Sequence, residues 1–598
     1  MRLQALSKKI TAVAVSALLL FSVSGCNRST GVAASPDADF DAFLEELFLE
    51  EVTSDTLSLH FTLRDPEGYG IEDMEPTLGD FTDRDFSNSA EDWEDVEATF
   101  KKLKSFRYSD LDEKQQLTYD ILYHYIEQEL SMKNCNYQGT VFGQVTGVQS
   151  NMPLNMSLYE FYSADDVEDY LALMEQLDDY FDYCIAYEQF RTDEGYGMSD
   201  GAIDDAIEQC EEFLAHTDDN YLITTFDHRV DALEGLSDTE RASYKDQNRN
   251  TVLNTIVPAY EAMIDDLNAL KGKGEDRGGI CNYEDGKEYY EYIVSHKTGS
   301  SKSIEEMKAV LEQVLDDAIE MSYDVYVNAP DVYMEYYGDE NFVVQGMSEP
   351  ESFLEYYKQE MALEFPTPPE VNYTISDIDP AIADIVSPAF CVTPCIDDYT
   401  ENVIQVNRSK DNGGSGGLSA MYAHEGYPGH LYQLTYFLST DPYPVRDTLS
   451  FLGYDEGWAM YVEMRSYNWV TYEDYDSKYV REMYVAGELM NIAFCCLADI
   501  NVNYYGYTVE ELSTYMDNLG FNGSAAQGLY DMMVEEPGYY PQYFVGYLEF
   551  AELRNYAKNA LGADFDEVAY HQVILETGPC DFDTLRAQMD KYIATVVD

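Results

Sequence analysis

The chain has 598 residues, with 35 Lys and Arg against 114 Asp and Glu, and a formal net charge of −79. A surface this acidic repels the phosphates of DNA and RNA, which excludes nucleic-acid binding as the function. Hydrophobic residues make up 45% of the chain, which excludes wholesale disorder and supplies core for two or three compact units or for one large helical body.

The N-terminal residues have the pattern of an export leader. A basic start that includes Arg2 precedes an apolar run over residues 10–23, which is short for a membrane span. The run ends in the sequence VSGC at Cys26, which resembles the bacterial lipobox. We therefore expect a signal peptide over residues 1–25 and a lipid, such as palmitate with diacylglycerol, on Cys26. An ordinary signal peptide with a chance cysteine is the alternative.

This leader implies a location. A lipidated Cys26 would hold the protein at the bacterial cell envelope, outside the cytoplasm. The membrane is then a partner through the N-terminal lipid anchor only, without a spanning helix. Residues 26–38 are rich in small side chains and are expected to form a tether.

Helical periodicity begins after the tether. Apolar side chains recur at helical spacing with acidic residues between them, at Phe40, Phe43, Leu44, Leu47 and Phe48. Similar amphipathic patterns recur at 110–133, 165–190, 201–216, 220–235 and 238–271. Ser237 with Glu240 and Ser303 with Glu306 have the spacing of capping boxes that start helices. The first half of the chain is thus predicted to be helical.

The polar stretch at 298–303 is a predicted boundary between two halves. We expect an N-terminal helical region over 39–300 and a C-terminal helical catalytic region over 301–598. Three prolines between 366 and 369 break the helical pattern, and the segments 371–375 and 403–407 alternate in polarity. The predicted fold is mainly α, a large multi-helix body with a small antiparallel β-sheet at about 370–407 near the active-site cleft.

One stretch, AHEGYPGH, carries the residues of a metal site. A His-Glu pair followed by a second His is typical of zinc peptidases, in which imidazoles bind the metal and the Glu accepts a proton from water. His424 and His430 lie six residues apart, which places them about 120° apart around a straight helix. Both rings can face one ion only if Pro428 and Gly429 bend the chain between them.

A third ligand is expected on a second helical segment, DEGWAMYVE, which begins at Asp455. Glu456 is the predicted ligand, and Asp455 is a candidate partner that orients a ligand histidine. Glu463 lies near the same helical face as Glu456 and is a rival ligand. In a chain this acidic, a solvated surface charge is the alternative for each of them.

HEGYPGH followed by EGWA resembles the bacterial "domain of unknown function 885" family, which contains many predicted lipoproteins. Further stretches that resemble the family bring the coverage to roughly residues 40–598: 221–226, 286–290, 393–398, 543–546, 553–554 and 570–571. The family is similar to helical zinc metallopeptidases of the gluzincin type. The resemblance implies one zinc ion in a deep cleft, held by His424, His430 and Glu456, with Glu425 as the general base. The chain departs from the family pattern at Cys391, Cys395 and Leu431.

Four more residues are candidates around this centre. Tyr543 lies in a family-like segment and is the predicted donor to the oxyanion, with Tyr547 as runner-up. Arg554 is a candidate clamp for a substrate carboxylate, and an ion pair with a neighbouring Glu is its alternative. By analogy with other zinc peptidases, Asn407 and the strand 403–407 would pair with an extended peptide.

The sequence therefore predicts a zinc-dependent metallopeptidase, with a peptide or another small amide as substrate. The same residues are compatible with a metal-dependent hydrolase of another amide or ester. A non-catalytic extracytoplasmic binding lipoprotein is the alternative from a different class of protein.

Overall fold

A computed structural model describes residues 37–597, apart from 73, 88–89, 136–138, 218, 275–276, 339–341, 384–385 and 410–415. The predicted leader and Cys26 lie outside the described residues. The chain divides into two compact units. Unit 1 contains the residues up to Tyr289 and two later segments, Tyr443–Thr448 and Val534–Glu536, and unit 2 contains the remainder. The predicted boundary at residue 300 lies beyond the observed one.

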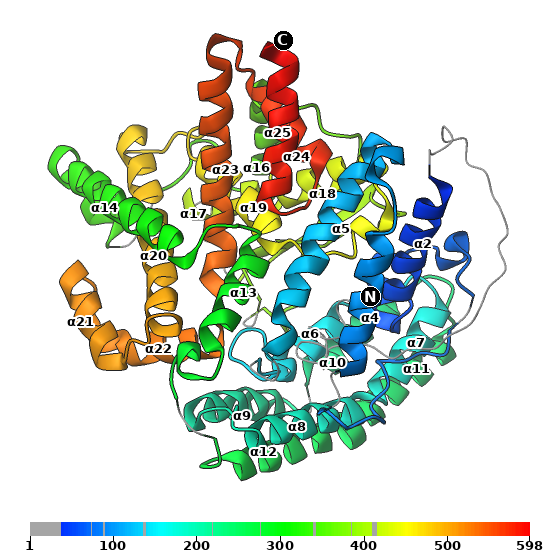
Figure 1. The fold of residues 1–598 in the computed structure, drawn as a ribbon. Helices are drawn as coiled ribbons and strands as arrows, with labels where there is room; N and C mark the ends of the chain where they lie inside the picture. Colours follow the sequence, from blue (N-terminus) through cyan, green and yellow to red (C-terminus); the bar gives the residue numbers. More distant parts are fainter. Residues whose placement is uncertain are drawn as a thin grey trace. The chain divides into compact units, whose positions relative to one another are not determined.

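Unit 1 is helical, as predicted. Its longer helices are α2 (Ala38–Val52), α4 (Ala90–Leu103), α5 (Glu113–Ser131), α6 (Val148–Leu158), α7 (Ala164–Met174), α8 (Leu177–Asp193), α9 (Asp200–Ala215), α10 (Tyr221–Ala232), α11 (Asp238–Thr251) and α12 (Val257–Leu270). The apolar stripe predicted on α2 is buried, and Ser237 and Glu240 form the predicted capping box of α11. In Figure 1, α8, α9 and α12 lie side by side, and α12 packs against both of the others.

The helical pattern predicted as one stretch over 238–271 is interrupted. A π-helical turn, Val252–Ile256, separates α11 from α12. Pro258, near the start of α12, has no N–H to donate to the carbonyl group four residues earlier, which explains a local change of hydrogen-bond pattern there.

Unit 2 contains the site predicted from the sequence. Its longer helices are α14 (Ile304–Asn328), α16 (Pro350–Glu360), α17 (Gly416–Glu425), α18 (His430–Ser439), α19 (Leu452–Ser466), α20 (Ser477–Asn503), α21 (Val509–Leu519), α22 (Ala526–Glu535), α23 (Tyr539–Leu561), α24 (Glu567–Thr577) and α25 (Phe582–Val597). Ser303 and Glu306 form the predicted capping box of α14. In Figure 1, α23 lies between α20 and α25 and contacts both.

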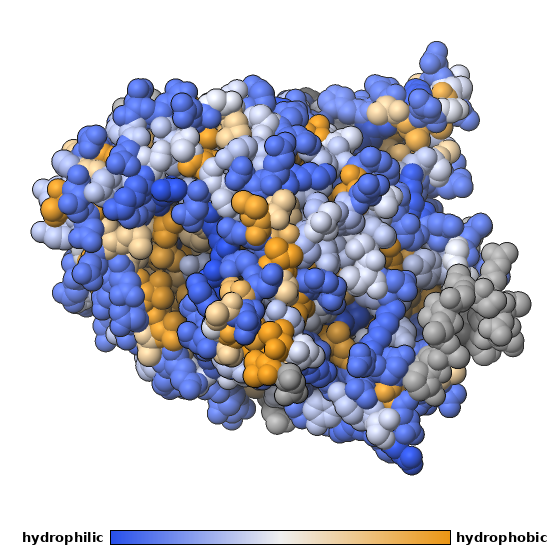
Figure 2. Space-filling view, turned by 90° about the horizontal axis from the view of Figure 1, so that it is seen from above, coloured by the Kyte–Doolittle hydropathy of each residue, from blue (hydrophilic) through white to orange (hydrophobic). Residues whose placement is uncertain are grey.

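Helix α20 is long and apolar enough to cross a membrane, with a mean hydropathy of 1.4. However, 61% of its most apolar 18-residue segment is buried inside the structure, and the helix packs along α14. Helix α20 is therefore a core helix of unit 2. On the face of the molecule in Figure 2, hydrophilic residues predominate and hydrophobic residues form separate patches. This surface agrees with the acidic composition.

The small sheet has three strands, β1 (Asn372–Asp377), β2 (Ala389–Cys391) and β3 (Glu401–Val406), in the order β1-β3-β2. β2 and β3 are antiparallel, but β1 and β3 are parallel. The prediction of an antiparallel sheet is therefore wrong for the two longer strands. Alternation of polar and apolar residues identifies a strand but not its direction, and here β2 intervenes and returns the chain to the end of the sheet at which β1 began.

Candidate metal centre

The chain bends sharply between the two candidate histidines. Helix α17 ends at Glu425, and α18 begins at His430. A Cβ atom on Gly429 would lie 1.7 Å from the carbonyl oxygen of His424, so only glycine allows the backbone to pass this close. The indole nitrogen of Trp458 donates to the carbonyl oxygen of Pro428 at 2.9 Å and ties the bend to α19. The predicted bend at Pro-Gly is present.

This bend brings the two imidazoles to a carboxylate on α19. Oε2 of Glu456 lies 3.5 Å from Nε2 of His424 and 3.6 Å from Nε2 of His430. One candidate ligand atom from each residue lies within 4.8 Å of the other two. The three side chains are mostly buried but retain 13–22% exposure, so a small ion or molecule can reach them.

The separations fit ligands that surround one ion. Zinc binds nitrogen and carboxylate oxygen at about 2.0–2.2 Å in tetrahedral geometry, which places two ligand atoms about 3.4 Å apart. Direct hydrogen bonds would have a separation of about 2.7–3.2 Å. Two imidazoles and a carboxylate are also a ligand set of catalytic zinc sites, which keep a fourth position open. The residues present therefore fit one divalent cation.

Charge around the cluster favours a cation. Burial opposes the charged form of His424, but the neighbouring carboxylates of Glu456 and Glu463 raise its pKa well above the ordinary value. Burial also opposes the charged form of His430, and Glu456 raises its pKa. Burial would raise the pKa of Glu456, yet its contacts with both histidines lower that pKa. The cluster thus keeps its carboxylate ionised and stabilises positive charge beside it.

Glu463 fixes the orientation of His424. Its Oε2 lies 3.0 Å from Nδ1 of His424. A carboxylate only accepts hydrogen bonds, so Nδ1 carries a proton toward Glu463, and Nε2 is the ring nitrogen that faces Glu456. Glu463 therefore contacts the outer ring nitrogen and is not placed as the rival ligand. Asp455, expected as the partner of a histidine, instead accepts a hydrogen bond from Gln433 at 2.6 Å, and burial raises its pKa to about 6.

Glu425, the predicted general base, is held by the backbone of the sheet. Its side chain is buried, and its Oε2 accepts a hydrogen bond from the Cys391 N–H at 2.8 Å. Cys391 ends β2, whose position beside α17 supplies this contact. No residue type signals this anchor in the sequence, because every residue except proline offers a backbone N–H. The cysteine at this departure from the family pattern therefore leaves the anchor of Glu425 intact.

Helix α23 brings Tyr543 close to Glu456. α19 and α23 cross so closely that a Cβ atom on Gly457 would lie 2.5 Å from the carbonyl carbon of Gly546. Burial, and next the charge of Glu456, raise the pKa of Tyr543, so its hydroxyl keeps the proton at neutral pH. A neutral tyrosine hydroxyl can donate a hydrogen bond to negative charge that develops on a substrate oxygen.

The family model described as "Bacterial protein of unknown function (DUF885)" matches residues 67–589. The chain belongs to this family. No curated protein matches its sequence.

The structure of this DUF885 chain is similar to two solved structures. One is of a candidate lipoprotein from Colwellia psychrerythraea, with 17% identity and a TM-score of 0.81, and covers 94% of this chain and 100% of that one. The other is of a candidate lipoprotein of unknown function from Shewanella oneidensis, with 18% identity and a TM-score of 0.59, and covers 93% and 100%. At these identities the likeness shows the fold alone.

The three predicted substrate-binding residues of this DUF885 chain have contacts or positions that differ from those expected. Arg554 forms an ion pair with Glu567, from Nε to Oε1 at 2.6 Å and from Nη2 to Oε2 at 2.9 Å, which was the alternative for this residue. Tyr547 lies one helical turn beyond Tyr543 and lines a separate pocket.

Asn407 does not fit the expected role in strand addition. Its side chain is buried and donates to the carbonyl oxygen of Ala383 at 2.6 Å. The strand that precedes it, β3, occupies the centre of the sheet between β1 and β2. A substrate peptide therefore finds no free edge at 403–406, and the prediction of strand addition there is wrong.

Proposed function

We propose that this protein is a zinc-dependent metallopeptidase. His424, His430 and Glu456 would hold one zinc ion, and Glu425 would act as the general base. The observation that carries the proposal is the separation of the three candidate ligand atoms, 3.5 and 3.6 Å from the Glu456 oxygen to the two imidazoles. Beside them lies a second carboxylate, Glu425, which is buried and anchored. When bound, zinc supplies Lewis-acid chemistry that acidifies water and polarises the carbonyl group of the substrate.

The chain's own residues then perform the proton transfers. Glu425, held by the Cys391 N–H, accepts a proton from the attacking water and delivers it to the leaving amine. Tyr543 donates a hydrogen bond to the oxygen on which negative charge develops. Glu463 keeps the His424 ring in place during these steps.

A second candidate function uses the same residues to hydrolyse another amide or an ester. A third is a non-catalytic binding lipoprotein whose metal is structural or absent. The position of Glu425 favours catalysis over the third, because a purely structural site has no use for a buried carboxylate beside its ligands. We further propose that Cys26 carries the lipid anchor and that the protein acts at the outer side of the cell membrane.

Metal content and peptide hydrolysis test the proposal together. We would compare the wild type with Glu425→Gln and with a matched control, Glu473→Gln, which replaces an exposed glutamate of the same unit. We expect one zinc ion per chain in all three proteins. Glu425→Gln should lower kcat/KM on a fluorogenic peptide library by about 100-fold to 10,000-fold, and the control should match the wild type.

Each other outcome rejects a specific claim. A wild type that binds no zinc or other divalent cation rejects both enzyme candidates. A wild type that binds zinc and cleaves esters or small amides but no peptide rejects the peptidase in favour of the second candidate. Unchanged turnover in Glu425→Gln removes Glu425 from the mechanism.

A further inference from the structure

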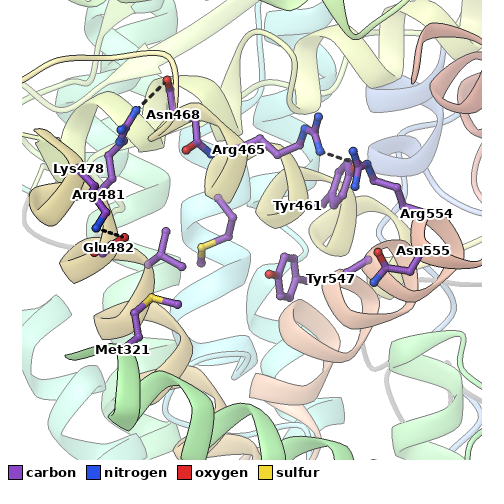
Figure 3. Close-up of a pocket in the computed structure, with 13 residues that line it drawn as sticks. Met321, Tyr461, Arg465, Asn468, Lys478, Arg481, Glu482, Tyr547, Arg554 and Asn555 are labelled. Atoms are coloured by element: carbon purple, nitrogen blue, oxygen red, sulfur yellow. Dashed lines mark hydrogen bonds and ion pairs between the residues drawn. The ribbon is translucent and has the colours of Figure 1, made fainter. Parts of the chain in front are cut away.

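Unit 2 contains a second candidate binding site, a pocket of about 410 Å³. Its walls come from α14, α19, α20 and α23, and four basic side chains line it: Arg465, Lys478, Arg481 and Arg554 (Figure 3). The pocket has the size of a small-ligand site.

The charge of this pocket is opposite to that of the chain. Four of its thirteen lining residues are basic and one, Glu482, is acidic, whereas the whole chain has 35 basic and 114 acidic residues. Acidic residues outnumber basic ones about threefold in this chain, so most basic side chains have carboxylates within reach. Four basic side chains around one pocket are therefore unusual for this protein.

Two of the four cations are already paired. Arg554 pairs with Glu567, and Arg465 pairs with both Glu567 and Glu364. These carboxylates fix the two guanidinium groups in position but neutralise part of their charge.

The other two cations remain largely available. Lys478 lies 3.6 Å from Glu482 one helical turn away, and both side chains are solvent-accessible, so this pair is weak. Arg481 donates to the carbonyl oxygen of Asn468 at 3.3 Å and forms no ion pair with a described residue. The guanidinium of Arg481 therefore has donors left for an anion.

The rest of the lining is suited to an organic ligand. Tyr547 and Asn555 offer polar groups, and Met321, Met464 and Val485 offer apolar surface (Figure 3). A carboxylate attached to a hydrophobic or extended chain matches this mixture of cations and apolar side chains.

The pocket shares its two central helices with the candidate metal centre. On α19, Met464 of the pocket directly follows Glu463, which contacts His424. On α23, Tyr547 of the pocket lies one turn after Tyr543, whose pKa is raised by burial and by the charge of Glu456. The pocket and the candidate metal centre are therefore built on the same two helices, which is the reason for assigning both to one substrate.

We propose that this pocket binds a carboxylate of the peptide substrate. Arg481, with Lys478, supplies the charge, and the planar guanidinium holds the carboxylate by two parallel hydrogen bonds. The inference rests on the proposed peptidase function and adds the substrate class, which is peptides with a free C-terminal carboxylate or an acidic side chain at the position that reaches the pocket.

Four peptides with one cleavable sequence test this inference. They end in Glu or Gln, each as the free acid or the amide, and kcat/KM is measured for the wild type, Arg481→Gln and a control, Lys591→Gln, which removes an exposed cation on α25. We expect the wild type to prefer a carboxylate-bearing peptide by at least about tenfold. Arg481→Gln should lower that preference about tenfold, Arg481→Lys should restore part of it, and the control should retain it.

The four peptides also identify the source of the carboxylate. Sensitivity to amidation assigns the pocket to the chain end, and sensitivity to the Glu-to-Gln exchange assigns it to a side chain. A wild type that distinguishes neither pair overturns the inference, as does an Arg481→Gln protein that melts at the wild-type temperature and keeps the full preference.

Calorimetric binding separates this inference from the proposed function. Glu425→Gln protein, with and without the added Arg481→Gln change, is titrated with the same four peptides. Loss of carboxylate preference on the second change supports the pocket even if the wild type hydrolyses no peptide. Equal binding of all four peptides by the Glu425→Gln protein rejects the pocket even if hydrolysis is observed.

Discussion

Two buried carboxylates of unit 2 have different surroundings. Asp499 accepts hydrogen bonds from the Gly538 N–H at 2.7 Å, the Asn503 amide at 2.8 Å and the Tyr290 hydroxyl at 3.1 Å. Glu456 instead has two imidazole nitrogens at 3.5 and 3.6 Å. The first carboxylate is satisfied by direct hydrogen bonds, whereas the second leaves a space of the size of an ion.

The same contrast appears in the pKa values. Burial raises the pKa of Asp499 to about 6 despite its three donors. The histidines lower the pKa of Glu456 although it too is largely buried. A buried acidic residue alone therefore does not indicate a candidate metal site in this chain; the identity and separation of its partners distinguish Glu456 from Asp499.

The largest expected effect comes from removing one candidate ligand. His430→Ala should weaken zinc binding by more than the roughly 100-fold that follows the loss of a residue that only supports a ligand. A competitive titration against a zinc chelator measures the change, with His216→Ala, at an exposed position of unit 1, as control. Equal zinc affinity in His430→Ala and the control would show that the spacing around Glu456 does not reflect a metal site.

The second prediction concerns Asp499 and pH. Its pKa is higher in the folded chain, at about 6, than its ordinary value of 3.8, so the folded state binds this proton more tightly. The resulting stabilisation is complete below about pH 3.8 and is lost as the pH rises through about 6, a change of about 3 kcal/mol at about 1.4 kcal/mol per pH unit.

Asp499→Asn removes this titration. The free energy of unfolding of the wild type minus that of the variant should fall by about 3 kcal/mol between about pH 4 and pH 7 in urea denaturation. A difference that stays constant over this range would contradict the role assigned to burial. Zinc affinity should be unaffected, which sharpens the contrast with Glu456.

The smallest of the three effects is expected at Glu463, which acts through His424. Glu463→Ala should lower zinc affinity by about 10-fold to 100-fold, because the imidazole loses the acceptor that fixes its orientation. Glu463→Gln retains an acceptor and should recover most of that affinity. If Gln and Ala behave alike, the hydrogen bond does not position the ring.

Much of the candidate centre follows from local sequence. A proline and a glycine between two histidines predict a bend, and the structure shows why the glycine is required, since a Cβ at 429 would collide with the carbonyl group of His424. The choice of Glu456 rests on the resemblance to zinc peptidases with a Glu ligand on a second helix, because helical spacing alone leaves Glu463 as a rival.

Other features depend on contacts between distant segments. Helical periodicity places Glu463 near the face of Glu456, but only the fold shows that Glu463 reaches the outer nitrogen of His424 while Asp455 turns to Gln433. The direction of β1 relative to β3 depends on the path of the connecting chain. The basic pocket collects residues from four helices, so no local pattern signals it.

The hydrogen bond from the Cys391 main chain to Glu425 has a consequence for substitution at this position. Because the donor belongs to the peptide group, the contact depends on the path of β2 and not on the side chain at 391. Any residue except proline retains this donor, so the surface beside Glu425 can be redesigned at 391 while the carboxylate keeps its anchor.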